Sequence, residues 1–287
     1  MPPPPAPRVS VVVPAFNNAE FVGATLASIL EQSFTDFELI VSDHSSTDAT
    51  WARLQDATAD PRVSLMIIPP GGGAPANWRA VTAAARGELV KLVCADDLLY
   101  PDALARQVAA FDAHPEAVLV AGQRDLIDQH GRVVLRARGL QGLDGVVAGR
   151  DAIRRTVRAG TNVFGEPGGV LFRRTTLLES GGWDAREPYL LDQATCARVL
   201  LHGPMVAIRS PLAAFRINPG QWSVALARSQ AAHARSFHHT LRAEHPEVLG
   251  DVDVRVGDVR ATAMAVVRRA SYLWLHRRSA STRNRAH

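Results

Sequence analysis

The chain has 287 residues, of which 47% are hydrophobic and 21% charged, and its formal net charge is +4. This length and composition can bury a full core, as one large domain or as one domain with an appendage. The small charge argues against a nucleic-acid partner, and no apolar run reaches the length of a membrane span. Because both cysteines, Cys94 and Cys196, lie in apolar surroundings, we expect a reduced, soluble and cytoplasmic protein.

Strands and helices alternate along the first part of the chain. Residues 1–8 form a Pro-rich leader that we expect to be disordered. Apolar runs predict strands at 9–13, 37–42, 63–68 and 90–95, and helical spacing predicts helices at 20–32, from about 48, at 77–86 and at 102–113. We interpret the glycines at 71–73 as a flexible connector. The alternation predicts a parallel sheet with helices on both faces.

Two adjacent carboxylates, Asp96 and Asp97, follow the apolar run 90–95. Two like charges at the end of a buried strand are costly unless a cation or a polyol lies between them. The carboxyl ends of strands are also where ligands bind in open α/β sheets. One aspartate would be enough to cap the following helix, so the second favours a ligand site over a cap.

After residue 113 the pattern changes. Residues 118–121 and 126–135, the latter with a turn at 129–132, are typical of antiparallel additions. We also predict strands at 168–173, 205–208 and 212–215, and a helix at 192–201. From Trp222 onward the pattern is helical. The expected organisation is therefore an α/β domain at 9–221, with a first half at 9–122 and a second half at 123–221, a helical extension at 222–278 and a disordered basic tail at 279–287.

Several familiar motifs are missing from the chain. No Gly-x-Gly-x-x-Gly turn follows the first strand, which argues against a dinucleotide-binding enzyme, and no Gly-Lys-Ser/Thr phosphate loop is present. The adjacent His238 and His239 would point in different directions on a helix, so we interpret them as a solvated surface pair rather than a metal site. These absences leave a nucleotide-type α/β domain with an acidic pair at its sheet edge.

Many short segments resemble the family 2 nucleotide-sugar glycosyltransferases, and their order and spacing make this a specific signal. They lie at residues 9–17, 28–34, 37–43, 46–48, 77–78, 86–92, 165–167, 169–174, 181–184, 190–192 and 211–216, and so span roughly residues 8–223. The resemblance implies a GT-A fold, a Rossmann-like mixed sheet flanked by helices. It also implies metal-dependent, inverting transfer from a nucleotide diphosphate sugar to a hydroxyl of a glycan, glycolipid or natural-product precursor, as in cell-envelope polysaccharide biosynthesis.

By this resemblance Asp97 would hold Mg²⁺ or Mn²⁺, and Asp96 would lie between the ribose and the metal. Such an ion, bridging both phosphates, would neutralise the charge of the leaving diphosphate. Cys94 stands where many relatives have the first aspartate of an Asp-x-Asp motif. With fewer protein ligands, we expect weak metal binding until the donor arrives.

The resemblance also implies a donor pocket at the ends of the first two strands. Its residues would be Pro14, Ala15, Phe16, Asn17, Asp43, His44 and Asn77, with Arg216 pairing with phosphate. For Phe16 alone, an ordinary core position is the alternative. His44 stands where many relatives have an aspartate that binds uracil, so the donor base stays open among the UDP, dTDP and GDP types. Asn218 similarly stands where relatives often have a histidine.

Asp192 is the expected catalytic base, because the family places its base at this helix start. The alternative is a helix N-cap, and the preceding residue, acidic in many relatives, is Leu191 here. Glu166 and Trp183 would contact the acceptor or the donor sugar, although Glu166 could equally be a plain loop carboxylate. We expect Lys91, inside a strand, to be structural and to meet a carboxylate.

Two other functions remain open. The departures at His44, Cys94, Leu191 and Asn218 leave room for a catalytically degenerate binding protein. A sugar nucleotidyltransferase of related architecture is disfavoured, since it would carry a Gly-rich loop after the first strand. The helix at 260–278, rich in arginine and aromatic residues, has two alternatives: contact with the inner face of an anionic membrane, or packing onto the domain.

Overall fold

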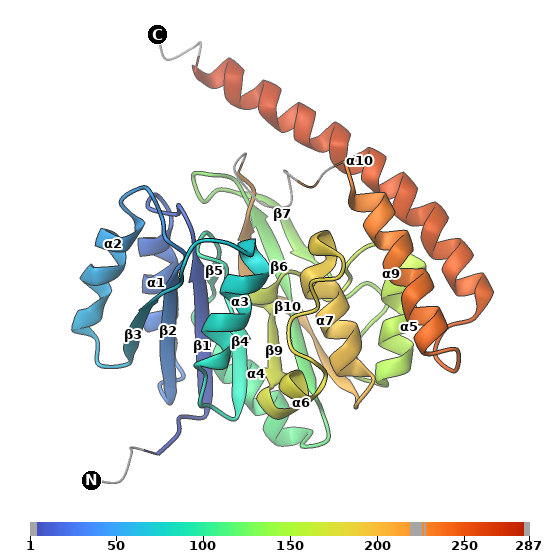
Figure 1. Ribbon diagram of the computed structural model, residues 1–287, viewed down its shortest axis with the longest axis horizontal. Helices are drawn as coiled ribbons and strands as arrows, with labels where there is room; N and C mark the ends of the chain where they lie inside the picture. Colours follow the sequence, from blue (N-terminus) through green and yellow to red (C-terminus); the bar gives the residue numbers. More distant parts are fainter. Residues whose placement is uncertain (1–4, 219–225, 227, 284–287) are drawn as a thin grey trace.

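The computed structural model describes residues 5–218, 226 and 228–283, with side chains of the last helix to residue 267. Within these residues ten strands form one mixed sheet in the order β3-β2-β1-β4-β9-β6-β10-β5, with β7 paired to β6 and β8 to β10 (Figure 1). The strands are β1 Val9–Ala15, β2 Phe37–Asp43, β3 Val63–Ile67, β4 Leu89–Leu92, β5 Leu98–Leu99, β6 Leu119–Ile127, β7 Val133–Arg138, β8 Gly145–Val147, β9 Val170–Arg173 and β10 Met205–Arg216.

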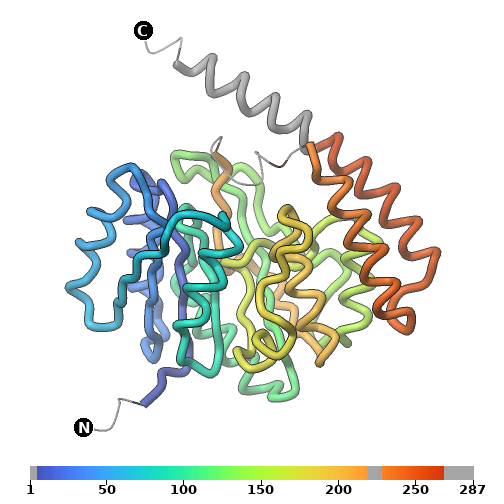
Figure 2. The backbone as a smooth tube through the Cα atoms, viewed as in Figure 1, coloured from blue at the N-terminus to red at the C-terminus, as the bar shows by residue number. Residues whose placement is uncertain are grey.

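Helices cover both faces of this sheet, each face with its own hydrophobic core (Figure 2). One core contains residues of α1 Val22–Leu30, α2 Thr50–Asp56 and α4 Ala103–Ala113. The other contains residues of α3 Gly73–Ala83, α5 Gly149–Ala159, α6 Arg174–Glu179, α7 Leu191–Leu200, α9 Gln230–Glu244 and α10 Asp251–Arg283. Short 3₁₀ turns lie at Ala57–Ala59, Pro167–Gly169 and Pro188–Leu190. The predicted mixed sheet flanked by helices, with a helical C-terminal part, is confirmed.

The strand pairing confirms the first part of the sequence analysis and corrects one point in the second. Strands β3, β2, β1 and β4 are all parallel, as the alternation predicted. The antiparallel additions at 118–121 and 126–135 are confirmed, since β6 pairs with β7 and β9 in antiparallel fashion. The segments predicted as separate strands at 205–208 and 212–215 form the single strand β10, which pairs with β6 in parallel. Its register shifts on either side of Pro211, because a proline has no N–H to donate to the ladder.

The chain ends also differ in part from the prediction. Arg8, inside the expected disordered leader, is ion-paired with Glu88 and Asp112. Helix α10 continues to Arg283, so residues 279–283 are helical rather than disordered, while 284–287 lie outside the described residues. The predicted start of the helical part at Trp222 also lies outside them. Among the helices that the structure describes, none is both long and apolar enough to cross a membrane.

Two glycines let α10 pack closely against the domain. A Cβ at Gly160, which has φ +64° at the C-terminus of α5, would lie 2.3 Å from the backbone nitrogen of Ala261. A Cβ at Gly257 would lie 2.5 Å from the carbonyl oxygen of Val157. Since only glycine fits such contacts, the first half of α10 is a built part of the domain. Of the two alternatives for the helix at 260–278, membrane contact or packing onto the domain, packing is therefore correct for its first residues, 260 and 261.

Lys91 lies fully buried at the centre of the sheet. Its Nζ donates hydrogen bonds to Gln107 Oε1 at 2.8 Å and to the Val170 carbonyl at 3.2 Å. Gln107 in turn donates to the Gly169 carbonyl at 2.9 Å, which ties α4 to the start of β9. The structural role is confirmed, but these partners are an amide and a carbonyl rather than the expected carboxylate. Burial lowers the pKa of Lys91 to about 7.

Replacing this lysine by methionine tests the lowered pKa. A folded pKa of about 7 lies below the ~10.4 of an unfolded lysine, so the unfolded state binds the proton more tightly. The cost of the buried charge is therefore full below pH 7 and falls as the pH rises toward 10, by up to about 1.4 kcal/mol per pH unit. We expect the free energy of unfolding of the wild type, relative to Lys91→Met, to increase across this window in urea titrations. A constant difference would contradict the assignment.

Candidate active site

A cavity of about 1450 Å³ opens where the ends of β1, β2 and β10 meet α7, α9 and α10. Pockets for one drug-sized ligand usually measure about 300–1,000 Å³, so this one has room for two partners. Of the residues that the sequence analysis expected to act in the site, eight line it: Pro14, Phe16, Asn17, His44, Asn77, Asp96, Glu166 and Asp192. Five others do not: Ala15, Asp43, Asp97, Trp183 and Arg216.

Phe16 and His44 form one end of the cavity. The Phe16 side chain is 54% exposed, so it is not the core residue that was the alternative. Its ring lies 6.0 Å, centroid to centroid, from the ring of His44. His44 Nε2 lies 2.9 Å from the carbonyl oxygen of Gly71, and because a carbonyl only accepts, Nε2 carries the hydrogen. The second ring nitrogen, Nδ1, is therefore a hydrogen-bond acceptor when the ring is neutral.

A buried layer of polar groups supports this end from behind. The Ser42 hydroxyl donates to Asn77 Oδ1 at 2.5 Å, and Asn77 Nδ2 donates to the carbonyl of Ala15 at 3.2 Å. Asp43 accepts hydrogen bonds from the backbone N–H and the hydroxyl of Ser46. Ala15 and Asp43 thus shape the turns that present Phe16 and His44, and they do not line the cavity themselves.

Asn17 joins the first of these turns to the second. Its backbone adopts φ 51°, a left-handed conformation that asparagine tolerates better than most residues. Its Oδ1 accepts the backbone N–H of Thr47 at 2.9 Å, and its own N–H donates to the Ser46 hydroxyl at 2.9 Å. Asn17 therefore fixes how the ends of β1 and β2 are placed beside each other.

The acidic pair is divided between the cavity and the interior, and Asp97, the predicted metal ligand, is the residue in the interior. Strand β4 ends at Leu92, and a turn closed by the Asp97 N–H on the Cys94 carbonyl follows. Asp97 is buried, and its Oδ1 accepts the backbone N–H of Arg216 at 2.9 Å. Burial and the neighbouring Asp96 raise the pKa of Asp97 well above its ordinary value. Asp96 lines the cavity, and its Oδ2 accepts Asn218 Nδ2 at 2.8 Å.

Arg216, the predicted phosphate contact, is buried and holds the backbone around the acidic pair. Its Nε donates to the Asp96 carbonyl at 2.8 Å, and one terminal nitrogen lies 3.2 Å from the carbonyls of both Asp128 and Gln129. The guanidinium also lies 4.8 Å from the ring centroid of Phe21. In this geometry Arg216 positions Asp96 rather than facing a ligand.

The donor set fits a divalent cation only in company with other ligands. No cluster of three or more His, Cys, Asp or Glu that could hold a metal occurs in the part of the chain described here. Burial and the charges of Asp97 and Asp96 raise the pKa of the Cys94 thiol well above its ordinary value, so it stays protonated and is no ligand for a hard cation. Asp96 supplies one carboxylate, which suits an ion such as Mg²⁺ that is bound by one or two carboxylates and by substrate phosphates.

Asp192 lies in the first turn of α7, after the N-cap position of Leu190, so it is not the N-cap residue. Its Oδ1 accepts the Gln193 N–H at 2.7 Å, and its Oδ2 accepts Asn162 Nδ2 at 2.9 Å. Burial, and then the nearby charge of Glu166, raise the pKa of Asp192 to about 6, against the lowering effect of these hydrogen bonds. A carboxylate with such a pKa is ionised near neutral pH and is a competent proton acceptor.

Glu166 is ion-paired with Arg124, whose Nη2 lies 3.0 Å from Glu166 Oε1. Both side chains line the cavity, and both are largely buried. Arg124 was not found from the sequence, where nothing distinguishes it from the other arginines. The pair makes Glu166 more than a plain loop carboxylate, because it places one negative charge beside Asp192.

Trp183, expected to contact a sugar, is instead a core residue, 1% exposed. Its indole Nε1 donates to the Thr82 hydroxyl at 2.8 Å, and its ring packs edge-on against Trp78 at 4.9 Å between centroids. Trp78 is the indole that lines the cavity. The sequence analysis assigned the sugar contact to Trp183 and gave Trp78 no role.

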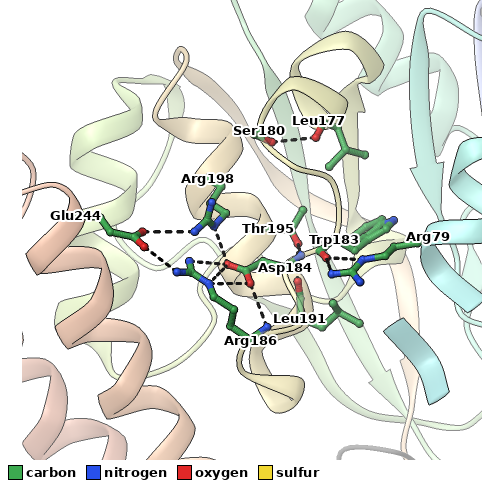
Figure 3. Close-up of polar contacts among 10 residues, drawn as sticks. All are labelled: Arg79, Leu177, Ser180, Trp183, Asp184, Arg186, Leu191, Thr195, Arg198 and Glu244. Carbon is green, nitrogen blue, oxygen red and sulfur yellow. Dashed lines mark hydrogen bonds and ion pairs between the residues drawn. The ribbon is translucent and has the colours of Figure 1, made fainter. Parts of the chain in front are cut away.

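The loop that follows Trp183 is fixed by a network of ion pairs (Figure 3). Asp184 accepts hydrogen bonds from Arg186 at 2.9 Å and from Arg198 of α7 at 2.6 Å. Both arginines also reach Glu244 at the end of α9, at 2.7 and 3.4 Å. The network joins the loop, the last turn of α7 and the end of α9, so it fixes the helix whose first turn carries Asp192 against α9.

The cavity also contains residues that the sequence analysis missed. Asn162 and Gln193 lie beside Asp192, and their sequence context carries no motif that could have identified them. His238, interpreted as half of a solvated pair, is 1% exposed and lines the cavity, while its neighbour His239 is exposed, with 67% of its side chain accessible. The alternation of a helix face could have predicted that only one of the two is exposed, but not which one.

The comparisons with known proteins agree on one family. The family model described as "Glycosyl transferase family 2" matches residues 10–180. An uncharacterized protein of Mycobacterium tuberculosis is 30% identical over 221 residues, which cover 74% of this chain and 68% of the relative. Succinoglycan biosynthesis protein ExoO of Rhizobium meliloti is 35% identical over 126 residues, 44% of this chain and 36% of that protein.

Solved structures show the same fold at low sequence identity. The S. aureus protein TarS, in complex with UDP-GlcNAc, has a TM-score of 0.66 and 18% identity over 87% of this chain and 70% of that one. The mannosyltransferase PcManGT of Pyrobaculum calidifontis, in complex with GDP-Man and Mn²⁺, has a TM-score of 0.60 and 19% identity over 95% of this chain and 81% of that one.

The pKa of Asp192 provides a test of the site's electrostatics. Replacing Glu166 by glutamine removes a negative charge and leaves Arg124 positive, and both changes favour the ionised form of Asp192. We expect the pKa of Asp192 to fall below about 6, while burial keeps it above the ordinary value of an aspartate. A carboxyl ¹³C NMR titration, with the resonance assigned by its loss in Asp192→Asn, measures the change. The same substitution at the exposed Glu179 is the control, and an equal shift there would contradict the interpretation.

Proposed function

This chain belongs to glycosyl transferase family 2, and we propose that it transfers a sugar from a nucleotide diphosphate sugar to an acceptor hydroxyl, with inversion and with the help of Mg²⁺ or Mn²⁺. One observation carries the proposal: Asp96 and Asp192 line the same cavity, which also presents Phe16 and His44. The cavity therefore offers three groups together. Asp96 supplies a carboxylate for the diphosphate end of the donor, Asp192 supplies a base for the acceptor, and Phe16 and His44 supply a surface for the nucleotide.

The nucleotide would lie at the end formed by Phe16 and His44. The exposed ring of Phe16 offers a flat apolar face to a base. His44 Nδ1, an acceptor because Nε2–H donates to Gly71, suits a ring N–H, which uracil, thymine and guanine all present. The donor is therefore of the UDP, dTDP or GDP type. TarS is described with UDP-GlcNAc and PcManGT with GDP-Man, which supports this class without choosing within it.

Asp192 is the proposed base. It would take the proton of the acceptor hydroxyl as that oxygen attacks the anomeric carbon, opposite the leaving group. The bond between the anomeric carbon and the phosphate oxygen then breaks, and its electron pair leaves with the nucleoside diphosphate. Asn162, which donates to Asp192 Oδ2, holds the carboxylate in place while Oδ1 stays against the helix N–H of Gln193.

Asp96 is the proposed protein ligand of the divalent ion, in place of Asp97. When bound, the ion would supply positive charge to the leaving diphosphate. Asn218 would orient the Asp96 carboxylate, and Arg216 fixes its backbone. The presence of Mn²⁺ with GDP-Man in the PcManGT complex supports a metal that arrives with the donor.

The alternative functions have less support. A sugar nucleotidyltransferase would need a phosphate-binding loop after β1, where the chain has a turn tied by Asn17 to Thr47. A degenerate binding protein would not need Asp192 held beside Asn162 with a pKa of about 6. The relatives include proteins of succinoglycan and O-antigen biosynthesis, so we propose a growing glycan or glycolipid as the acceptor.

Asparagine at position 192 tests the base. We expect turnover of the nucleotide sugar with its acceptor to fall ~10²–10⁴-fold, because the acceptor oxygen then keeps its proton. Wild-type kcat should fall as the pH drops below about 6, where Asp192 becomes protonated. Rates are measured by nucleoside diphosphate release from UDP-, dTDP- and GDP-sugars. Asp144→Asn, at an exposed aspartate, is the control, and near-normal turnover by Asp192→Asn would overturn the assignment.

Two further asparagine variants separate the members of the acidic pair. Asp96→Asn removes the carboxylate that faces the cavity, so the Mn²⁺ concentration for half-maximal turnover should rise at least roughly 10-fold. Asp97→Asn keeps an oxygen for the Arg216 N–H at a position outside the cavity lining, so metal activation should change little. Initial rates across a Mn²⁺ series measure both. Greater loss of metal activation in Asp97→Asn would restore the prediction made from the sequence.

A further inference from the structure

Two side chains beside α9 and α10 line the cavity and carry a hydrogen-bond acceptor each. They are Gln193, next to the proposed base, and His238, and both are 1% exposed. Within the part of the chain described here, the Gln193 Oε1 atom is buried and receives no hydrogen bond. His238 uses its Nδ1 atom for Asp258, which leaves Nε2 as its acceptor.

The orientation of Gln193 follows from its neighbour Thr156. The Thr156 hydroxyl donates its hydrogen to the Thr161 carbonyl at 3.1 Å and accepts the Val163 N–H at 3.3 Å. Its remaining lone pair, 3.1 Å from the Gln193 amide, must therefore face the NH₂ group. This arrangement fixes the amide, and Oε1 is left as an acceptor without a partner.

The orientation of His238 follows from Asp258 of α10. His238 Nδ1 lies 2.8 Å from Asp258 Oδ1, and an ionised carboxylate only accepts, so Nδ1 carries the hydrogen. Burial lowers the pKa of His238, which leaves the ring neutral and Nε2 with a lone pair. Gly257 permits the close approach, since a Cβ there would lie 3.0 Å from the ring of His238.

The two residues share one neighbourhood on α5. Gln193 is bonded to Thr156, and His238 packs against Gly257, which in turn contacts the carbonyl of Val157. The apolar side chains of Leu190, Ala234, Ala261 and Met264 line the same part of the cavity. A buried acceptor without a partner, such as Gln193 Oε1, destabilises the protein, so a ligand that supplies a hydrogen-bond donor to it is favoured.

We propose that this end of the cavity binds the acceptor as a sugar or polyol whose hydroxyls donate to Gln193 Oε1 and His238 Nε2, which places a further hydroxyl at Asp192. The inference rests on the proposed function and adds to it two residues that bind and select the acceptor. Acceptor hydroxyls have the donors that both atoms lack, and the apolar residues suit the carbon face of a pyranose. The C-terminal helices, beyond the residues matched by the family model, supply half of this subsite.

The test measures binding of p-nitrophenyl glycosides (α- and β-linked glucose, galactose, mannose and N-acetylglucosamine). Full-length protein is saturated with the nucleoside diphosphate that it binds and Mn²⁺, and glycoside affinity is measured by saturation-transfer difference NMR. We expect at least one glycoside to bind the wild type. His238→Asn retains a donor for Asp258 but loses the Nε2 acceptor, and Gln193→Met loses Oε1. Each should weaken glycoside binding about 3- to 10-fold, as expected for one hydrogen bond.

His239→Asn is the matched control. His239 bonds to the same Asp258, at 2.9 Å, but its side chain is exposed and outside the cavity lining, so glycoside binding should not change. Binding of the nucleoside diphosphate reports whether each variant is folded. The proposal is overturned if no glycoside binds the wild type, or if His238→Asn and Gln193→Met bind as well as His239→Asn. If the wild type turns over no nucleotide sugar, the proposed function itself fails, whatever the result of the glycoside measurement. Failure of the acceptor subsite and failure of the proposed function can therefore be distinguished.

Discussion

The structure depends on how the two adjacent carboxylates after β4 are accommodated. Two negative charges beside each other in the interior would repel, and each would lack solvation. The backbone N–H of Arg216 donates a hydrogen bond to the buried carboxylate of Asp97. The guanidinium of the same residue donates to the backbone carbonyl of Asp96. One residue of β10 thereby determines that one carboxylate is buried and the other faces the cavity. Because the same guanidinium also holds the carbonyls of Asp128 and Gln129, the end of β4, the end of β10 and the turn after β6 form one unit.

Much of the fold could be predicted because it depends on patterns that are local in sequence. The strands of the parallel part and their helices follow from apolar runs and helical spacing, and the ligand edge follows from the topology of such a sheet. Pairings between distant segments could not be predicted in this way. The parallel pairing of β10 with β6 joins residues about 90 positions apart, and no local pattern specifies its direction.

The site was predictable in its location more than in its details. Asp192, Asp96 and Phe16 line the cavity, since the helix start and the sheet edge that carry them were predicted. The details depend on which way a side chain points. The turn after Leu92, closed by the Asp97 N–H on the Cys94 carbonyl, leaves Asp97 buried and Asp96 in the cavity, and the resemblance alone did not indicate this. Trp183 is core because Thr82, 101 positions away, bonds to its indole.

Two kinds of structure form the cavity: turns at the ends of parallel strands form one end, and packed helices form the other. The nucleotide end consists of turns at the ends of parallel strands, which the sheet itself positions. The other end depends on helix packing, and the ion pairs of Asp184, Arg186, Arg198 and Glu244 connect α7 to α9 (Figure 3). Asp192 stands where the two meet. Burial and Glu166 raise its pKa, whereas Asn162 and the start of α7 lower it, and the result of about 6 lets the carboxylate be ionised at neutral pH yet still take up a proton. A change in the packing of α7 would therefore shift the pKa of Asp192 while the strands of the sheet stayed in place.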